Sequence, residues 1–149
     1  MQADLLPSDF ACWRQSWDMP LADGLVQPTS VDDWQRLLNM LQSSSAWRLD
    51  WHGAAAVDDA HQLLADRLTV GVWLTLPTMV SLFPYSSDEV SLELDVRTVD
   101  DAVEAAAVSG FLRAVGELTH CDVLLTYEVM PDEPVARYSH SDGAFFVLG

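Results

Sequence analysis

Adjacent pairs of carboxylates are the residues of this sequence with the clearest chemical potential. The tripeptide Val-Asp-Asp occurs three times, at residues 31–33, 57–59 and 99–101. Two neighbouring carboxylates could bind a cation or exchange a proton. Each copy, however, stands where a helix is expected to begin, and acids in a first turn stabilise the positive end of the helix dipole. Helix capping is therefore the favoured interpretation of all three copies, with catalysis, metal binding or an internal repeat as the alternatives.

Histidine and cysteine give weaker signals. The chain has four histidines, His52, His61, His120 and His140. No two of them have a spacing typical of a metal site, so the sequence predicts no metal, no cofactor and no catalytic residue. Asp58 and His61, one helical turn apart, are the only pair that invites a test for catalysis. The two cysteines do not form a disulfide framework, and both are expected to be buried as small hydrophobic side chains: Cys12 and Cys121.

The charge of the chain restricts its partners. Asp and Glu number 23 against seven Arg, there is no lysine, and the net charge is −16. At pH 7 such a protein repels nucleic acid and anionic membranes and attracts basic surfaces. Half of the residues are hydrophobic, which is a folding composition. No apolar run is long enough to span a membrane and no signal peptide is apparent, so we expect a single cytoplasmic domain over residues 1–149.

Helical periodicity appears at two main places. Ser30 precedes an amphipathic stretch, which predicts a helix over 30–43 that ends in a run of serines. A second helix is expected over 99–118, with an apolar stripe that begins at Val103. The stripe is completed by small and apolar residues, Ala107, Gly110, Phe111, Ala114, Val115 and Leu118.

Strands are indicated by alternation of apolar and polar residues. They are expected over residues 47–52, in a meander within 68–97, over 122–128, and in a hairpin over 137–148 that turns at 141–143. The predicted fold is therefore α+β, a mostly antiparallel β-sheet with helices packed on one face as an α/β sandwich. Strand 122–128 follows a helix, so it could also pair in parallel through a crossover.

The first 28 residues give a different pattern. They contain three prolines, and we expect residues 1–28 to be irregular, with one short helix. Phe10, Trp13 and Trp17 share one face of this helix, so the segment is expected to dock on the main body.

One strand carries the strongest functional signal. Within residues 89–97 the apolar positions point inward, which leaves Glu89, Glu93 and Asp95 on the open face of the sheet. Residues 88–133 hold twelve acids and two arginines, a balance of −10. Aromatic rings among carboxylates are typical of protein-binding surfaces, although a merely solvated sheet face is the alternative. The predicted partner-binding residues are Trp73, Glu89, Glu93, Asp95, Glu128, Asp132 and Glu133, with Phe83 and Tyr85 as weaker candidates.

The C-terminal half also resembles a known family. The acidic strand 89–97, the helix with Gly110-Phe111-Leu112, and the run 123–128 that continues through Pro131 and Pro134 to Arg137-Tyr138 are similar to small bacterial immunity proteins. These proteins are encoded beside polymorphic toxins of contact-dependent, Rhs-type or type VI systems. The likeness covers roughly residues 47–140 and lies in structural motifs.

The resemblance implies a cytoplasmic inhibitor, monomeric or homodimeric, that binds a cognate toxin domain and occludes its active site. Toxins of this kind that act on nucleic acid are commonly basic, which an acidic surface would suit. Two other functions remain open. The chain could be a secretion adaptor or chaperone that holds an effector, or a small carboxylate-based hydrolase that uses Asp58 and His61 or the acids of strand 89–97.

Overall fold

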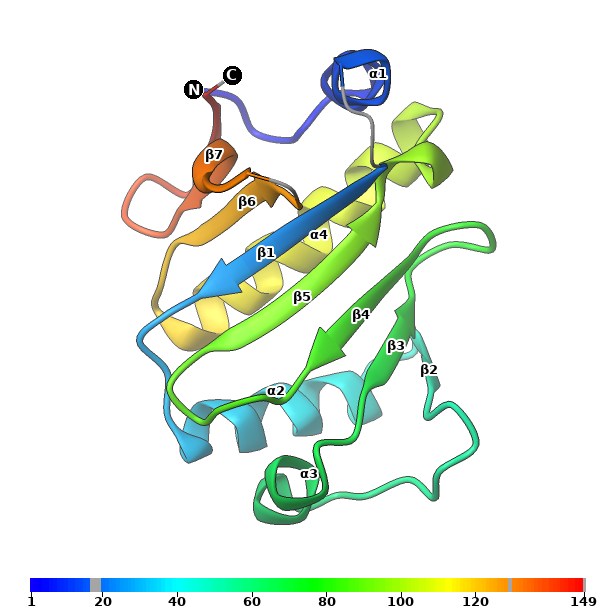
Figure 1. Ribbon diagram of the computed structural model, residues 1–149, viewed down its shortest axis with the longest axis vertical. Helices are drawn as coiled ribbons and strands as arrows, with labels where there is room; N and C mark the ends of the chain where they lie inside the picture. The colour runs from blue at the N-terminus through cyan, green and yellow to red at the C-terminus, as the bar shows by residue number, and fades with distance from the viewer. Residues whose placement is uncertain (17–19, 129, 149) are drawn as a thin grey trace.

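The computed structural model describes residues 1–16, 20–128 and 130–148, apart from the side chain of Pro131. Within these residues the chain forms one eight-stranded antiparallel sheet, with helices packed against it (Figure 1). The α+β prediction is confirmed. The helices are α1 (Pro7–Ser16), α2 (Val31–Ser43), α3 (Ala60–Asp66), the 3-10 turn η1 (Val96–Thr98) and α4 (Ala102–Thr119). The strands are β1 (Leu21–Val26), β2 (Arg48–Asp50), β3 (Val70–Trp73), β4 (Met79–Phe83), β5 (Val90–Asp95), β6 (Val123–Tyr127), β7 (Met130–Ser139) and β8 (Ala144–Val147).

The order of the strands places the N-terminal segment at the centre of the sheet. The order is β2-β3-β4-β5-β1-β6-β7-β8, so β1 lies between β5 and β6. The strands pass in front of α4 in Figure 1, and the face turned to the reader is the one that α2 and α4 leave uncovered. The hydrophobic core lies on the other face, between the strands and these two helices.

Strand β1 corrects the prediction that residues 1–28 are irregular. The sequence Leu-Ala-Asp-Gly-Leu-Val alternates in burial, but its Asp-Gly pair is typical of a turn. Gly24 instead sits against Leu92 of β5, and a Cβ atom at this position would come within 2.3 Å of Leu92 Cδ1. The glycine therefore provides room for a close approach of neighbouring strands. The predicted docking helix exists as α1, with Phe10 and Trp13 buried, while Trp17 lies outside the described residues.

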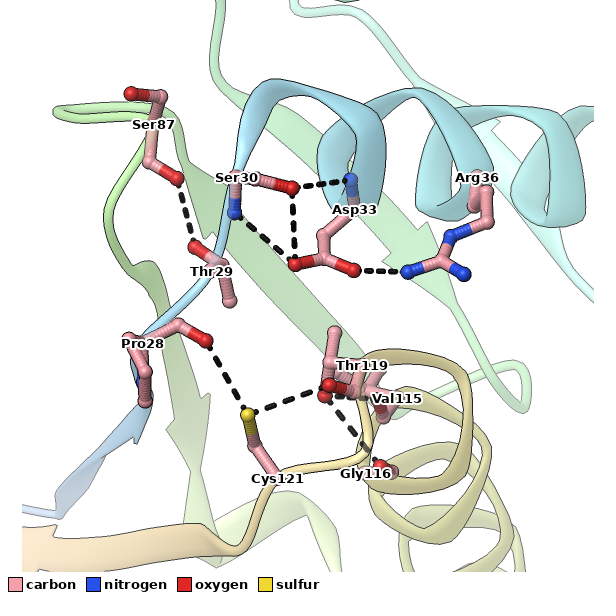
Figure 2. A network of polar contacts seen from close by, with 10 residues as sticks. All are labelled: Pro28, Thr29, Ser30, Asp33, Arg36, Ser87, Val115, Gly116, Thr119 and Cys121. Atoms are coloured by element: carbon pink, nitrogen blue, oxygen red, sulfur yellow. Dashed lines mark hydrogen bonds and ion pairs between the residues drawn. The ribbon is translucent and has the colours of Figure 1, made fainter.

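The three Val-Asp-Asp copies act as helix caps, as predicted. Figure 2 shows the first copy, where Ser30 and Asp33 form a capping box at the start of α2 and Arg36 pairs with Asp33. In the other two copies the second aspartate is itself the N-cap. Asp59 accepts a hydrogen bond from the backbone of residue 61 at 2.9 Å, and Asp101 accepts one from that of residue 104 at 2.9 Å. These carboxylates satisfy backbone N–H groups that the first helical turn leaves free.

The predicted apolar stripe of the long helix is wrong by about one residue. Val103 is 71% exposed, whereas Val108 and Leu112 face the core. Phe111 and Val115 belong to both the predicted and the observed face. The reason is that α4 is rich in alanine and glycine, which fit a buried or an exposed position equally well.

The remaining predictions concern connections and burial. Strand β6 pairs antiparallel with β1 and β7, so the alternative of a parallel crossover is wrong. The terminal hairpin β7–β8 is confirmed.

Cys12 is exposed, contrary to prediction, because the buried face of α1 is the one that carries Phe10 and Trp13. Cys121 is partly buried against the core. Among the described residues, no helix combines the length and the apolar character that crossing a membrane requires.

Candidate functional site

The register of four neighbouring strands brings carboxylates together on the uncovered face. Glu93 of β5 lies opposite Asp23 of β1 on one side and Ser81 of β4 on the other. Asp23 in turn lies opposite Thr126 of β6. Side chains at directly opposed positions share one face of a sheet. Glu128, two residues beyond Thr126, follows the end of β6, where its backbone N–H donates to the carbonyl of residue 21 at 3.3 Å.

The next row on the same face is apolar. Ser91 of β5 lies opposite Phe83 of β4 and Leu25 of β1, and Leu25 lies opposite Leu124 of β6. Tyr85 extends this row, since its ring stacks on that of Phe83 with centroids 5.6 Å apart and 9° between the planes. The tyrosine is 61% exposed, so its side chain can meet another molecule.

Between the two rows the surface is hollowed into a groove of about 370 Å³. This volume is at the lower end of the range typical of ligand sites. The residues that line the groove are Asp23, Gly24, Leu25, Phe83, Tyr85, Ser91, Leu92, Glu93, Leu124, Thr126, Glu128 and Pro134. The groove thus has a carboxylate side and an aromatic–aliphatic side, both carried by strands of the sheet and by residues that follow them.

Three carboxylates of the groove lack a compensating cation. Among the described residues, Asp23, Glu93 and Glu128 make no ion pair, and Oε2 of Glu128 is buried without a hydrogen-bond partner. Burial, followed by repulsion from Glu128, raises the pKa of Asp23. Burial, followed by repulsion from Asp23, Glu128 and Asp95, raises the pKa of Glu93. Ionisation of these groups is therefore opposed both by partial desolvation and by their neighbours.

Asp95 occupies the same face but a different electrostatic environment. Its carboxylate accepts a hydrogen bond from Arg97 Nη2 at 2.7 Å, and this interaction lowers the pKa of Asp95. Because Arg97 neutralises the charge of Asp95, this carboxylate contributes less negative electrostatic potential to the groove than Asp23 or Glu93 does.

The raised pKa values predict that neutralising a groove carboxylate stabilises the fold. For Asp23 and Glu93 the folded pKa lies above the unfolded pKa, so between these two values the folded state binds more protons. Stability contributed by these groups therefore falls as pH rises through the folded pKa. We expect Glu93→Gln and Asp23→Asn each to raise Tm at pH 7 by about 1–2 °C, a small effect because solvent screens the repulsion.

Thermal unfolding between pH 3 and pH 8 measures this effect. The gain in Tm of Glu93→Gln should disappear below the unfolded pKa, where the wild-type carboxyl is already neutral. Glu133→Gln, an exposed change outside the groove, is the matched control and should leave Tm unaltered. A fall in Tm for both groove variants at pH 7 would show that the carboxylates stabilise the sheet by contacts instead of straining it.

The structure brings four of the predicted partner-binding residues into the groove: Phe83, Tyr85, Glu93 and Glu128. Trp73 does not line the groove, because it belongs to β3, which β4 separates from β5. It lines a separate hollow near the β2 edge, where Arg48 stacks over its ring at 5.5 Å. Three further predicted residues do not line the groove: Glu89, Asp132 and Glu133.

Sequence reasoning missed the residues of β1 that complete the groove. Asp23 and Leu25 belong to the segment that was expected to be irregular. The alternating burial of Leu21–Val26 follows an alternation in side-chain size that was present in the sequence. Leu124 and Thr126 lie on the predicted strand 122–128, but their pairing with β1 required β1 to be recognised first.

The histidines form no comparable site. The backbone N–H of His61 donates to the carboxylate of the Asp59 cap, and no contact joins the His61 ring to Asp58 in the described structure. The rings of His120 and His140 meet edge to face with centroids 5.3 Å apart. Within residues 1–16, 20–128 and 130–148, no three His, Cys, Asp or Glu side chains are placed to hold a metal ion.

Comparison with protein families, curated proteins and solved structures finds no match to this chain. The geometry and charge of the groove are therefore the basis for inferring function.

Proposed function

We propose that this protein is an immunity protein, an inhibitor that binds a basic toxin domain through the groove and occludes the toxin's active site. The observation that carries the proposal is the set of uncompensated carboxylates, Asp23, Glu93 and Glu128, next to the exposed ring of Tyr85. The resemblance of roughly residues 47–140 to small immunity proteins supports the same function. A cytoplasmic location belongs to this proposal.

Electrostatics supports a basic partner. The groove carboxylates repel one another and the chain carries a net charge of −16, so an approaching cationic surface is attracted from a distance. Burial and, after it, repulsion between carboxylates raise the pKa of Asp23 and Glu93, and on contact the partner's cations would relieve the repulsion. Binding would therefore relieve electrostatic repulsion that is present in the free protein. Because the groove lies on a sheet, binding would order few additional groups, and its entropic cost would be low.

The lining of the groove favours binding over catalysis. A carboxylate-based hydrolase would use two carboxyls whose pKa values are shifted apart, or a carboxyl with a proton-transfer partner such as histidine, whereas burial raises the pKa of Asp23 and Glu93 alike. Among the described lining residues there is no histidine, lysine, arginine or cysteine. An apolar wall and an exposed aromatic ring are instead features of protein-binding surfaces.

The test is affinity capture with the intact protein at ~50 mM salt and again at ~500 mM salt. The expected result is a folded basic domain bound in equal amount at low salt, released at high salt, and inhibited in its own activity when bound. A captured domain that remains fully active would indicate an adaptor. Failure to bind or inhibit the basic domain encoded beside its gene would overturn the proposal.

A further inference from the structure

We propose that the groove receives an arginine side chain of the partner, with the guanidinium among the carboxylates and the aliphatic stem along the apolar wall. The inference rests on the proposed function, since it names the chemistry by which a basic partner is recognised. The inference concerns only the groove, so it can be tested with a small peptide in place of the partner.

Arginines of the chain itself already bind the two kinds of group that line the groove. On the same face, Arg137 stacks over Phe146 at 5.1 Å, because its strand position opposes both Leu124 and Phe146. Arg48 stacks over Trp73 near the other edge, and Arg97 pairs with Asp95. The rings of Phe146 and Trp73 and the carboxylate of Asp95 thus each have an arginine of the same chain as a partner.

The groove holds both kinds of group and no arginine. Tyr85 is 61% exposed, Glu93 and Asp23 oppose each other on the adjacent strands β5 and β1, and no described arginine pairs with or stacks on any of them. Oε2 of Glu128 is buried and without a hydrogen-bond donor. That oxygen has almost no accessible surface, so a guanidinium in the groove would pair with the partly exposed carboxylates of Asp23 and Glu93, while Glu128 would add negative potential.

The shape and spread of the carboxylates favour a guanidinium over other cations. The three groups do not form a set of ligands for a metal ion, so a small cation would not satisfy them together. A guanidinium is planar, carries five N–H donors, is weakly hydrated and stacks on aromatic rings. A lysine ammonium is a strongly hydrated point charge and gains less from the apolar wall of Leu25 and Leu124.

The test is an NMR titration of the full chain with three capped tripeptides, Gly-Arg-Gly, Gly-Lys-Gly and Gly-citrulline-Gly. Citrulline has nearly the shape of arginine but no charge. We expect the arginine peptide to shift the amide signals of Asp23, Tyr85 and Glu93, to bind at least about 5-fold more tightly than the lysine peptide, and to leave the signals of α4, behind the sheet, unchanged. The citrulline peptide should cause no saturable shift.

Matched variants establish the site. Glu93→Gln should weaken binding of the arginine peptide by about 10-fold, since it removes one charge-assisted contact, whereas Glu104→Gln, in the first turn of α4 and outside the groove, should have no effect. The amide spectrum of each variant reports at the same time that it is folded. Equal binding of arginine and lysine, or shifts confined to other surfaces, would overturn the inference.

Failure of this inference is distinguishable from failure of the proposed function. If a basic toxin is captured in a salt-dependent way but the arginine peptide does not select the groove, the inhibitor function stands and the arginine pocket is refuted. If the peptide binds as expected while no basic domain is inhibited, the pocket stands and the inhibitor function is refuted.

Discussion

Replacing Asp23 and Glu93 together by lysine should reduce affinity for the proposed basic partner by about 100-fold or more. The two side chains oppose each other on β1 and β5, and the change puts two cations where the partner's cations are expected to lie. Steered association reaches ~10⁸–10⁹ M⁻¹s⁻¹ at low salt against ~10⁵–10⁶ without steering, so most of the loss should appear in the association rate. Stopped-flow binding at ~50 mM and ~500 mM salt measures it, and the variant should have lost its salt dependence.

A control with the same change of charge separates the groove from the protein's overall charge. Asp58→Lys with Asp66→Lys also moves the net charge from −16 to −12, because each substitution adds two units. Both aspartates are exposed and lie at or beside α3, outside the groove. We expect this variant to bind with an affinity within about threefold of wild type, since distant surface charges are screened. Equal losses in both variants would mean that only net charge matters and would refute the groove as the interface.

In the proposed function, the groove carboxylates favour binding of a basic partner but lower the stability of the fold. Glu93 and Asp23 lie on central strands, where two serines or threonines could fill the same positions without repulsion. Instead the fold accommodates two acids whose ionisation is opposed by burial and by each other. Features that weaken a fold without a structural benefit concentrate at sites of function. The increase in Tm expected for Glu93→Gln and the loss of binding expected on charge reversal at Glu93 are two results of this one arrangement.

Elements with a strict pattern could be predicted from the sequence. In β5 the positions of Val90, Leu92 and Leu94 alternate with polar residues, and the alternation alone determines which side faces the helices. Helix α2 has both a cap at Ser30 and a clear apolar stripe, so its start and its buried face were correct. In each case two independent signals, local and periodic, agree.

The parts that escaped prediction depend on tertiary contacts. The Asp23-Gly24 pair favours a turn by local propensity, and only the close approach of Leu92 explains why glycine belongs in a central strand. The orientation of α4 is ambiguous in sequence because its alanines fit either face. The groove combines residues of β1 and β6 with residues of β4 and β5, so its composition could not be read before the order of the strands was known.

Replacing Trp34 by alanine should lower the free energy of unfolding by about 3–5 kcal/mol. Trp34 lies in α2 and is only 1% exposed, so truncation leaves a large cavity in the core. Its indole Nε1 also donates to the backbone carbonyls of Ser86 at 3.1 Å and Glu89 at 3.2 Å. Both acceptors belong to the loop between β4 and β5, which carries Tyr85 to the groove. Chemical denaturation followed by far-UV circular dichroism measures the change.

Trp34→Phe separates packing from the position of this loop. Phenylalanine retains most of the apolar surface but cannot donate to Ser86 and Glu89, so we expect a smaller loss of about 1–3 kcal/mol. The loop keeps a second anchor, since Thr29 Oγ1 donates to the carbonyl of Ser87 at 2.8 Å (Figure 2). If Trp34 holds Tyr85 in place, the folded phenylalanine variant should bind the arginine peptide more weakly than wild type. Unchanged peptide binding in that variant would mean that Thr29 alone is sufficient to position the aromatic side of the groove.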